Sequence, residues 1–223
     1  MDALDSLLMF LGSSVCHQLA ERSYSFGDTQ MPLCARCVGI HLGFLLSMAF
    51  LWTGGRRYAS SLPSRNGLIL LGAVMSLVFI DTGLSYSGIL PSDNVRRTLS
   101  GLALGVPLPF VLVPLLNMTM FPGRNPRSPI ADRRDWLWPV LICAFGAVAI
   151  LSAPSTYAVF LAVSLAGVVG MFVFFSTFFL VLLSLSFEGW TFGPGVRATA
   201  SVVLAVSVLM ILAVVHGTYF PNV

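Results

Sequence analysis

The feature that most constrains this chain is a succession of apolar stretches, each about as long as a membrane-spanning helix. One spanning helix needs roughly 20 predominantly apolar residues. The stretches are 32–52, 67–90, 97–118, 136–153, 157–186 and 196–219. Only 9% of the 223 residues are charged, whereas soluble domains carry about 25% charged residues. The sequence therefore predicts an all-α fold, a polytopic transmembrane helix bundle of about six spans in the lipid bilayer.

The N-terminal segment 1–19 is apolar on one face but is shorter than a span. Its apolar residues recur at helical spacing, at Leu4, Leu7, Leu8, Leu11 and Val15. We expect an interfacial or re-entrant helix rather than a secretory signal, because the segment has no basic start and no small-residue cleavage site. The spans and their short loops leave little room for anything else, so residues 1–223 are expected to form a single membrane-embedded domain.

The arginines predict the orientation in the cell membrane. All twelve basic residues are Arg, and eight of them lie in the segments 53–66, 119–135 and 187–197 on one side of the bundle. The other four are Arg22, Arg36, Arg96 and Arg97. The positive-inside rule places the larger group in the cytoplasm, which puts the cysteine-rich segment on the extracytoplasmic side; the Arg96–Arg97 pair opposes this orientation. Arg scattered over loops does not indicate a nucleic-acid partner.

Three prolines interrupt the stretch 97–118. Pro107, Pro109 and Pro114 remove three backbone donors in close succession, so this helix is expected to be kinked or broken. Inside a membrane such a break is tolerated where it lines a wet cavity or where a neighbouring helix fills it. The first possibility indicates a pathway for a small solute, and the second indicates packing.

The residues best suited to chemistry are Cys16, His17, Cys34, Cys37 and His41. On one helix, positions 34, 37 and 41 point from the same face, and the upstream Cys-His pair can fold back onto that face. Three thiols and one or two imidazoles suit tetrahedral zinc, with iron as an alternative metal. Four such ligands would make a closed structural site, whereas a bound water would allow hydrolysis of a membrane-borne substrate. On the opposite face, Gly39 and Gly43 have a spacing that lets another helix approach closely.

Other interpretations of the cysteines remain open. Cys34 and Cys37 at the start of a helix can be a redox pair, because the helix dipole and Arg36 favour the thiolate. Such a thiol–disulfide oxidoreductase would work with partner thiols, which reduce the disulfide, or with a quinone, which accepts the electrons. Outside the cytoplasm a structural disulfide is also possible, and buried cysteines can simply pack. Cys143, alone in the stretch 136–153, is expected to be a small core residue.

Asp81 is the charged residue placed furthest inside a span, which makes it a candidate for function. Together with Arg97, and with His216 near the C-terminus, it is expected to face the same outer cavity as the cysteines. Asp81 would act as a base or support a ligand, and Arg97 would hold an anionic group of the substrate. The alternative is an ion pair of Asp81 with Arg96 or Arg97 that ties two helices together. Glu21 and Arg22 are expected to anchor the chain at the interface.

Two blocks of this sequence resemble a family of small predicted membrane proteins, domain of unknown function 2085. The first block is Cys16-His17-Gln18, Glu21-Arg22-Ser23 and Cys34-Ala35-Arg36-Cys37 with Gly39, Ile40 and Gly43; the second is Asp81, Gly83, Asn94, Arg97, Thr98, Gly101 and Gly105. The sequence differs from the family pattern at His41, where an aromatic residue is expected. The resemblance names no reaction, but it implies that the Cys-His, Cys-x-x-Cys, Asp and Arg positions form one site.

Overall fold

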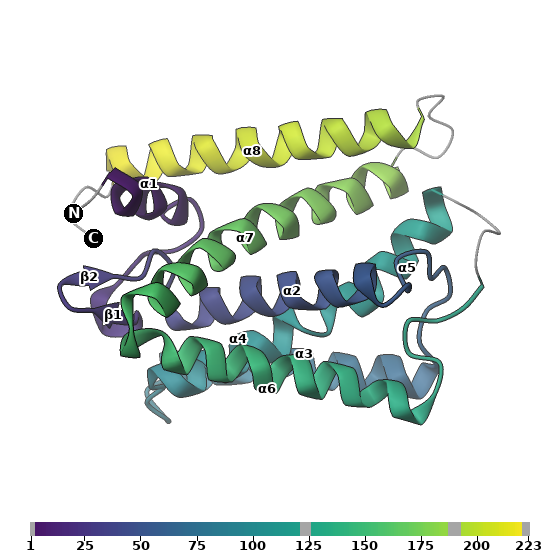
Figure 1. Cartoon of the computed structure of the whole chain (residues 1–223), viewed down its shortest axis with the longest axis horizontal. Helices are drawn as coiled ribbons and strands as arrows, with labels where there is room; N and C mark the ends of the chain where they lie inside the picture. The colour runs from purple at the N-terminus through teal and green to yellow at the C-terminus, as the bar shows by residue number, and fades with distance from the viewer. Residues whose placement is uncertain (1–2, 121–125, 187–192, 220–223) are drawn as a thin grey trace.

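The chain folds into a bundle of long helices with a small irregular segment at one end (Figure 1). A computed structural model describes residues 3–120, 126–186 and 193–219. The elements in chain order are α1 (Ala3–Gly12), η1 (Ala20–Arg22), β1 (Ser25–Phe26), β2 (Thr29–Gln30), α2 (Ala35–Thr53), α3 (Arg65–Tyr86), α4 (Asn94–Gly105), α5 (Leu108–Met120), η2 (Arg133–Trp136), α6 (Leu137–Ser152), η3 (Ala153–Ser155), α7 (Tyr157–Ser186) and α8 (Pro194–Tyr219).

The predicted fold class is confirmed. Within the described residues, six helical segments are long and apolar enough to cross a membrane, counting α4 with α5 and α6 with its flanking turns η2 and η3. Their outward surfaces carry large exposed apolar side chains, such as Phe79 on α3, Phe145 on α6 and Ile211 on α8. A surface of this kind suits lipid rather than water. The predicted N-terminal helix is also present as α1, whose 10 residues are too few to span a bilayer.

Helix α2 lies in the middle of the bundle, between α7 on one side and α4 on the other (Figure 1). Glycines allow the close approach on both sides. A Cβ placed at Gly39 would lie 2.6 Å from the Thr98 carbonyl oxygen, and one at Gly105 would collide with the Ile40 carbonyl. On α7, a Cβ at Gly170 would collide with the His41 carbonyl. The prediction that the face of Gly39 packs against another helix is therefore confirmed, and α4 is that helix.

The expected break in the span 97–118 is also present. Helix α4 ends at Gly105 and α5 begins at Leu108, with Pro107 at the junction. The break frees the carbonyl of Val106, and the buried hydroxyl of Ser47 on α2 donates to it at 2.9 Å. A neighbouring helix thus satisfies one carbonyl at the break, which favours the packing alternative of the two that the prolines allow.

The two ends of the bundle carry different segments of the chain. One end carries α1, the β1–β2 hairpin, the start of α2, the end of α3 and the start of α4 (Figure 1). The opposite end carries the Arg-rich connections, although Arg124 lies outside the described residues. There Arg56 binds Asp135 at 2.7 Å, and Asn117 donates to the carbonyls of Arg57 and Ala59. All the candidate site residues except His41 and Asp81 lie at the first end, outside the middle of the spans.

Candidate metal centre

Gln18 fixes the segment that precedes α2. Its side-chain amide donates to the Met9 carbonyl at 2.7 Å and to the Pro32 carbonyl at 2.8 Å. Gln18 itself has a φ of 53°, a left-handed conformation that turns the chain back toward α2. Gln30 in turn donates to the Gln18 carbonyl at 2.5 Å. These bonds hold the segment carrying Cys16 against the residues just before Cys34.

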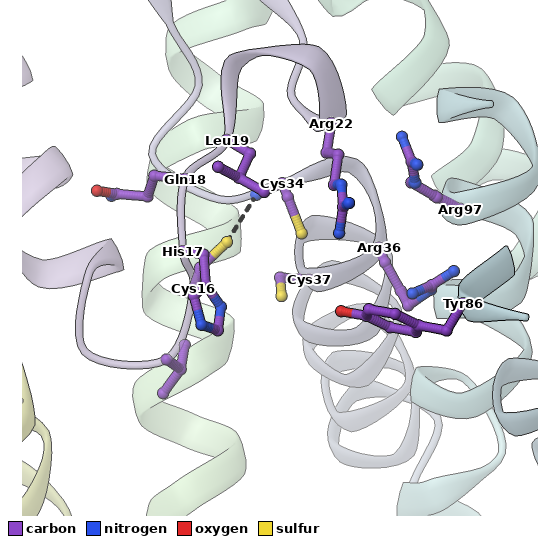
Figure 2. Close-up of a pocket in the computed structure, with 11 residues that line it drawn as sticks. Cys16, His17, Gln18, Leu19, Arg22, Cys34, Arg36, Cys37, Tyr86 and Arg97 are labelled. Atoms are coloured by element: carbon purple, nitrogen blue, oxygen red, sulfur yellow. Dashed lines mark hydrogen bonds between the residues drawn. The ribbon is translucent and has the colours of Figure 1, made fainter. Parts of the chain in front are cut away.

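The three cysteines of the first end come together in one cluster. Their sulfur atoms, on Cys16, Cys34 and Cys37, all lie within 4.8 Å of one another. Cys34 caps the N-terminus of α2, and its backbone N–H donates to the Cys16 Sγ at 3.2 Å (Figure 2). Cys37 follows one turn later on the same face. We call Cys16, Cys34 and Cys37 the thiol cluster.

The cluster favours one ionised sulfur. The Cys16 and Cys37 thiols donate to Cys34 and hold the pKa of Cys34 well below its usual range. The same bond to Cys34 raises the pKa of Cys16, because it stabilises the protonated form of the donor, and burial raises it further. The thiolate is the form of cysteine that binds metals and attacks electrophiles. The arrangement therefore places a nucleophilic sulfur and two further thiols at the start of α2.

A pocket of about 260 Å³ opens beside the thiol cluster. Its polar lining consists of His17, Gln18, Arg22, Arg36, Tyr86 and Arg97, together with the three cysteines. Figure 2 shows Arg22 running down beside Cys34, with Arg36, Arg97 and Tyr86 on the side facing α3 and α4. The Arg22 guanidinium lies 5.9 Å from the centre of the Tyr86 ring. The pocket thus combines thiols with three guanidinium groups.

The histidines lie at different distances from the cluster. His17 is exposed at the pocket, and its ring centre is 6.3 Å from that of His216 on α8. These two rings and Cys16 also line a second hollow of about 250 Å³. His41 is only 5% exposed, and its ring packs against Phe174 and Phe175 of α7. The described residues within ligand distance of one another include neither His17 nor His41.

Asp81 lies in α3, where it joins three helices rather than lining the pocket. Its carboxylate forms ion pairs with Arg36 of α2 and, at 3.1 Å, with Arg96 of α4. Ser92 and Ser100 also donate to it, each at 3.2 Å. The predicted ion pair with Arg96 is therefore present, and Arg36 is a second partner. Because Arg36 stands between Cys34 and Cys37, Asp81 is linked to the thiol cluster through that side chain.

Two arginines besides Arg36 line the pocket, of which the sequence indicated only one. Arg97, which was expected in the same outer cavity as the cysteines, lines it and donates to the Asn94 side chain at 3.2 Å. Arg22, which was expected only to anchor the chain at the interface, lines it as well. Gln18 was visible in the sequence only as a neighbour of the cysteines. Arg36 was expected to favour a thiolate, but its ion pair with Asp81 was not predicted. Cys143 is partly buried on α6 and lines a separate apolar groove.

Known proteins place this arrangement in a family. The family model described as "Predicted membrane protein (DUF2085)" matches residues 16–111. An uncharacterised protein of Methanothermobacter thermautotrophicus is 30% identical over 95 residues, which are 42% of this chain and 80% of that protein. The chain belongs to the DUF2085 family. The DUF2085 match runs from Cys16 into α5, so it includes the thiol cluster, Asp81, Arg97 and the break at Pro107.

A second relative matches a stretch of similar length. An uncharacterised protein of Methanocaldococcus jannaschii is 28% identical over 103 residues, 46% of this chain and 64% of that protein. No solved structure matches the chain. The DUF2085 membership establishes an integral membrane protein, and the chemistry has to be argued from the site.

Proposed function

We propose that this integral membrane protein binds a metal ion, zinc, through Cys16, Cys34 and Cys37. The observation that carries the proposal is the convergence of three sulfur atoms within 4.8 Å of one another from two separate segments. Thiolates are the ligands that zinc prefers in structural sites, and a group of three is a large part of a tetrahedral shell. Hydrogen bonds of Gln18 hold the two segments together before any metal binds.

A fourth ligand could come from the pocket, because all three cysteines line it. His17 lines the same pocket and is a protein candidate for that ligand, whereas His41 packs against aromatic rings of α7. A site with three protein ligands leaves its last position to water or to a ligand that enters through the pocket. Asp81 supports the site by positioning Arg36 and does not supply a base, because two guanidinium groups occupy its carboxylate.

We also propose that the thiol cluster lies on the extracytoplasmic side of the cell membrane. Four of the twelve arginines belong to the segments at this end and eight to the other connecting segments. The positive-inside rule counts these basic residues, and acidic partners contribute little to it. The opposite, Arg-rich end then faces the cytoplasm.

Metal analysis tests the metal proposal on protein purified in mild detergent without chelator or reductant. We expect about one zinc per chain, and loss of the metal in Cys16→Ser, Cys34→Ser and Cys37→Ser variants, because each removes a sulfur ligand. Cys143→Ser is the matched control, since it removes a cysteine outside the cluster, and it should keep its zinc. Purified wild-type protein that holds no metal while all four thiols remain free would overturn the proposal.

A free-thiol count on the same samples addresses the other chemistry of the cluster. Because sulfurs this close can also form a disulfide, a metal-free protein with two thiols missing would indicate the thiol–disulfide oxidoreductase instead. Partner thiols would then supply the electrons, and a quinone would accept them. Transport of a small solute has less support, because Ser47 of α2 fills the break at Pro107.

A further inference from the structure

The pocket beside the thiol cluster carries more positive charge than its neighbours neutralise. We propose that it binds a phosphate group, held by Arg22 and Arg97 over the metal position. This inference rests on the proposed metal function, because the metal determines the charge at the base of the pocket. The phosphate of a lipid headgroup and free phosphate present the same chemistry to these side chains.

The three guanidinium groups of the pocket differ in whether a carboxylate neutralises their charge. Arg36 forms an ion pair with the Asp81 carboxylate, so its charge is already neutralised. Among the described residues, Arg97 has no carboxylate within ion-pair distance, and its guanidinium donates to the neutral Asn94 side chain. Arg22 meets Glu21 at 3.5 Å, but the Glu21 side chain is 73% exposed, and an exposed pair of this kind contributes little. Two guanidinium groups therefore remain to attract an anion.

The metal-bound cluster offsets only part of the positive charge in the pocket. Three thiolates around one Zn²⁺ keep a net charge of about −1, whereas Arg22 and Arg97 bring two positive charges to the same pocket. Positive charge therefore remains, and like charges brought together in this way favour an added anion.

The shape of the pocket favours phosphate among possible anions. Each guanidinium offers a planar fork of N–H donors that matches two oxygens of one phosphate. The volume of about 260 Å³ is large enough for a phosphate group and the beginning of an ester chain. Tyr86 is 75% exposed at the pocket and can flank such a chain.

Calorimetric titration of the zinc-loaded protein in detergent tests this proposal. The two probes are inorganic phosphate and dihexanoyl phosphatidic acid, a short-chain lipid that carries the same group. We expect saturable binding by wild-type protein and affinities about tenfold lower in Arg22→Gln and Arg97→Gln, since each loses one charge-assisted contact. Arg65→Gln is the matched control; Arg65 is the exposed first residue of α3, one helix length from Tyr86, and the variant should bind like wild type.

Zinc content measured before and after each titration keeps the two proposals separate. Wild-type protein that holds zinc but shows no saturable binding of either probe overturns the phosphate site and leaves the metal centre standing. Equal affinities in wild type, Arg22→Gln and Arg97→Gln overturn it as well. Loss of zinc in wild-type protein before phosphate is added counts against the metal centre instead. A preference for the lipid over inorganic phosphate identifies the headgroup as the source, and the reverse preference identifies free phosphate.

Discussion

Gln18 is uncharged, and its contribution to the site is to hold the neighbouring segments in place. Its amide bonds to the carbonyls of Met9 and Pro32 keep α1, the Cys16 segment and the start of α2 in a fixed relation. Replacing Gln18 by Ala leaves two carbonyls without this donor, so we expect the free energy of unfolding to fall by about 1–3 kcal/mol. Zinc affinity should fall as well, because Cys16 is no longer held near Cys34.

Thermal unfolding in detergent and competition for zinc with a chromophoric chelator measure these two effects of Gln18→Ala. Ser76→Ala is the control, because its hydroxyl bonds only to the Ala73 carbonyl within α3, and it should leave zinc affinity unchanged. A Gln18→Ala protein with wild-type zinc affinity would show that the metal alone organises the segment. Gln18→Gly should be the less destabilised of the two variants, since glycine adopts a positive φ without strain.

The single-residue predictions succeeded where local spacing decides position. Cys34 and Cys37 are one helical turn apart, and a short upstream segment can reach them, so the sequence was enough to group them with Cys16. His41 lies a further turn along α2, where Phe174 and Phe175 of α7 enclose it. Neighbours that far apart in the chain cannot be read from local periodicity. The position of Arg22 could not be predicted from local spacing either, because it depends on how η1 folds over α2.

At the level of elements, a buried ion-pair cluster joins α2, α3 and α4. Asp81 of α3 is only 7% exposed and binds both Arg36 and Arg96. Asp81→Asn leaves two guanidinium groups without their counter-charge, so we expect a loss of roughly 3 kcal/mol in the free energy of unfolding. It should also weaken zinc binding, because Arg36 lies between two cysteines of the cluster.

Asp135→Asn provides the comparison for Asp81→Asn. Asp135 binds Arg56 at 2.7 Å, but at the opposite end of the bundle. Both variants should unfold at lower temperature in detergent, whereas only Asp81→Asn should need more zinc for half-saturation in a chelator competition. If the two variants bind zinc equally, Asp81 holds the helices together without positioning the thiol cluster.

The element boundaries show the same division between what the sequence can and cannot predict. Apolar length was enough to predict the spans, and three prolines were enough to predict the interruption between α4 and α5. The partner of the interrupted backbone could not be predicted, because Ser47 reaches the Val106 carbonyl across a helix interface. The spacing of Gly39 and Gly43 predicted a close contact but could not name α4 as its partner.

For the whole molecule, the distribution of Arg over the two ends makes a prediction about sidedness. Cysteines introduced singly at exposed positions report it, with Asp28→Cys in the hairpin near the thiol cluster and Asn66→Cys at the start of α3. In intact cells a membrane-impermeant maleimide should label Asp28→Cys above the level of the parent chain. Asn66→Cys should gain label only after the membrane is permeabilised, because the Arg-rich end is expected in the cytoplasm. The opposite labelling pattern would show the inverted orientation, with the thiol cluster in the reducing cytoplasm. There, three close thiols are more stable as metal ligands than as a disulfide.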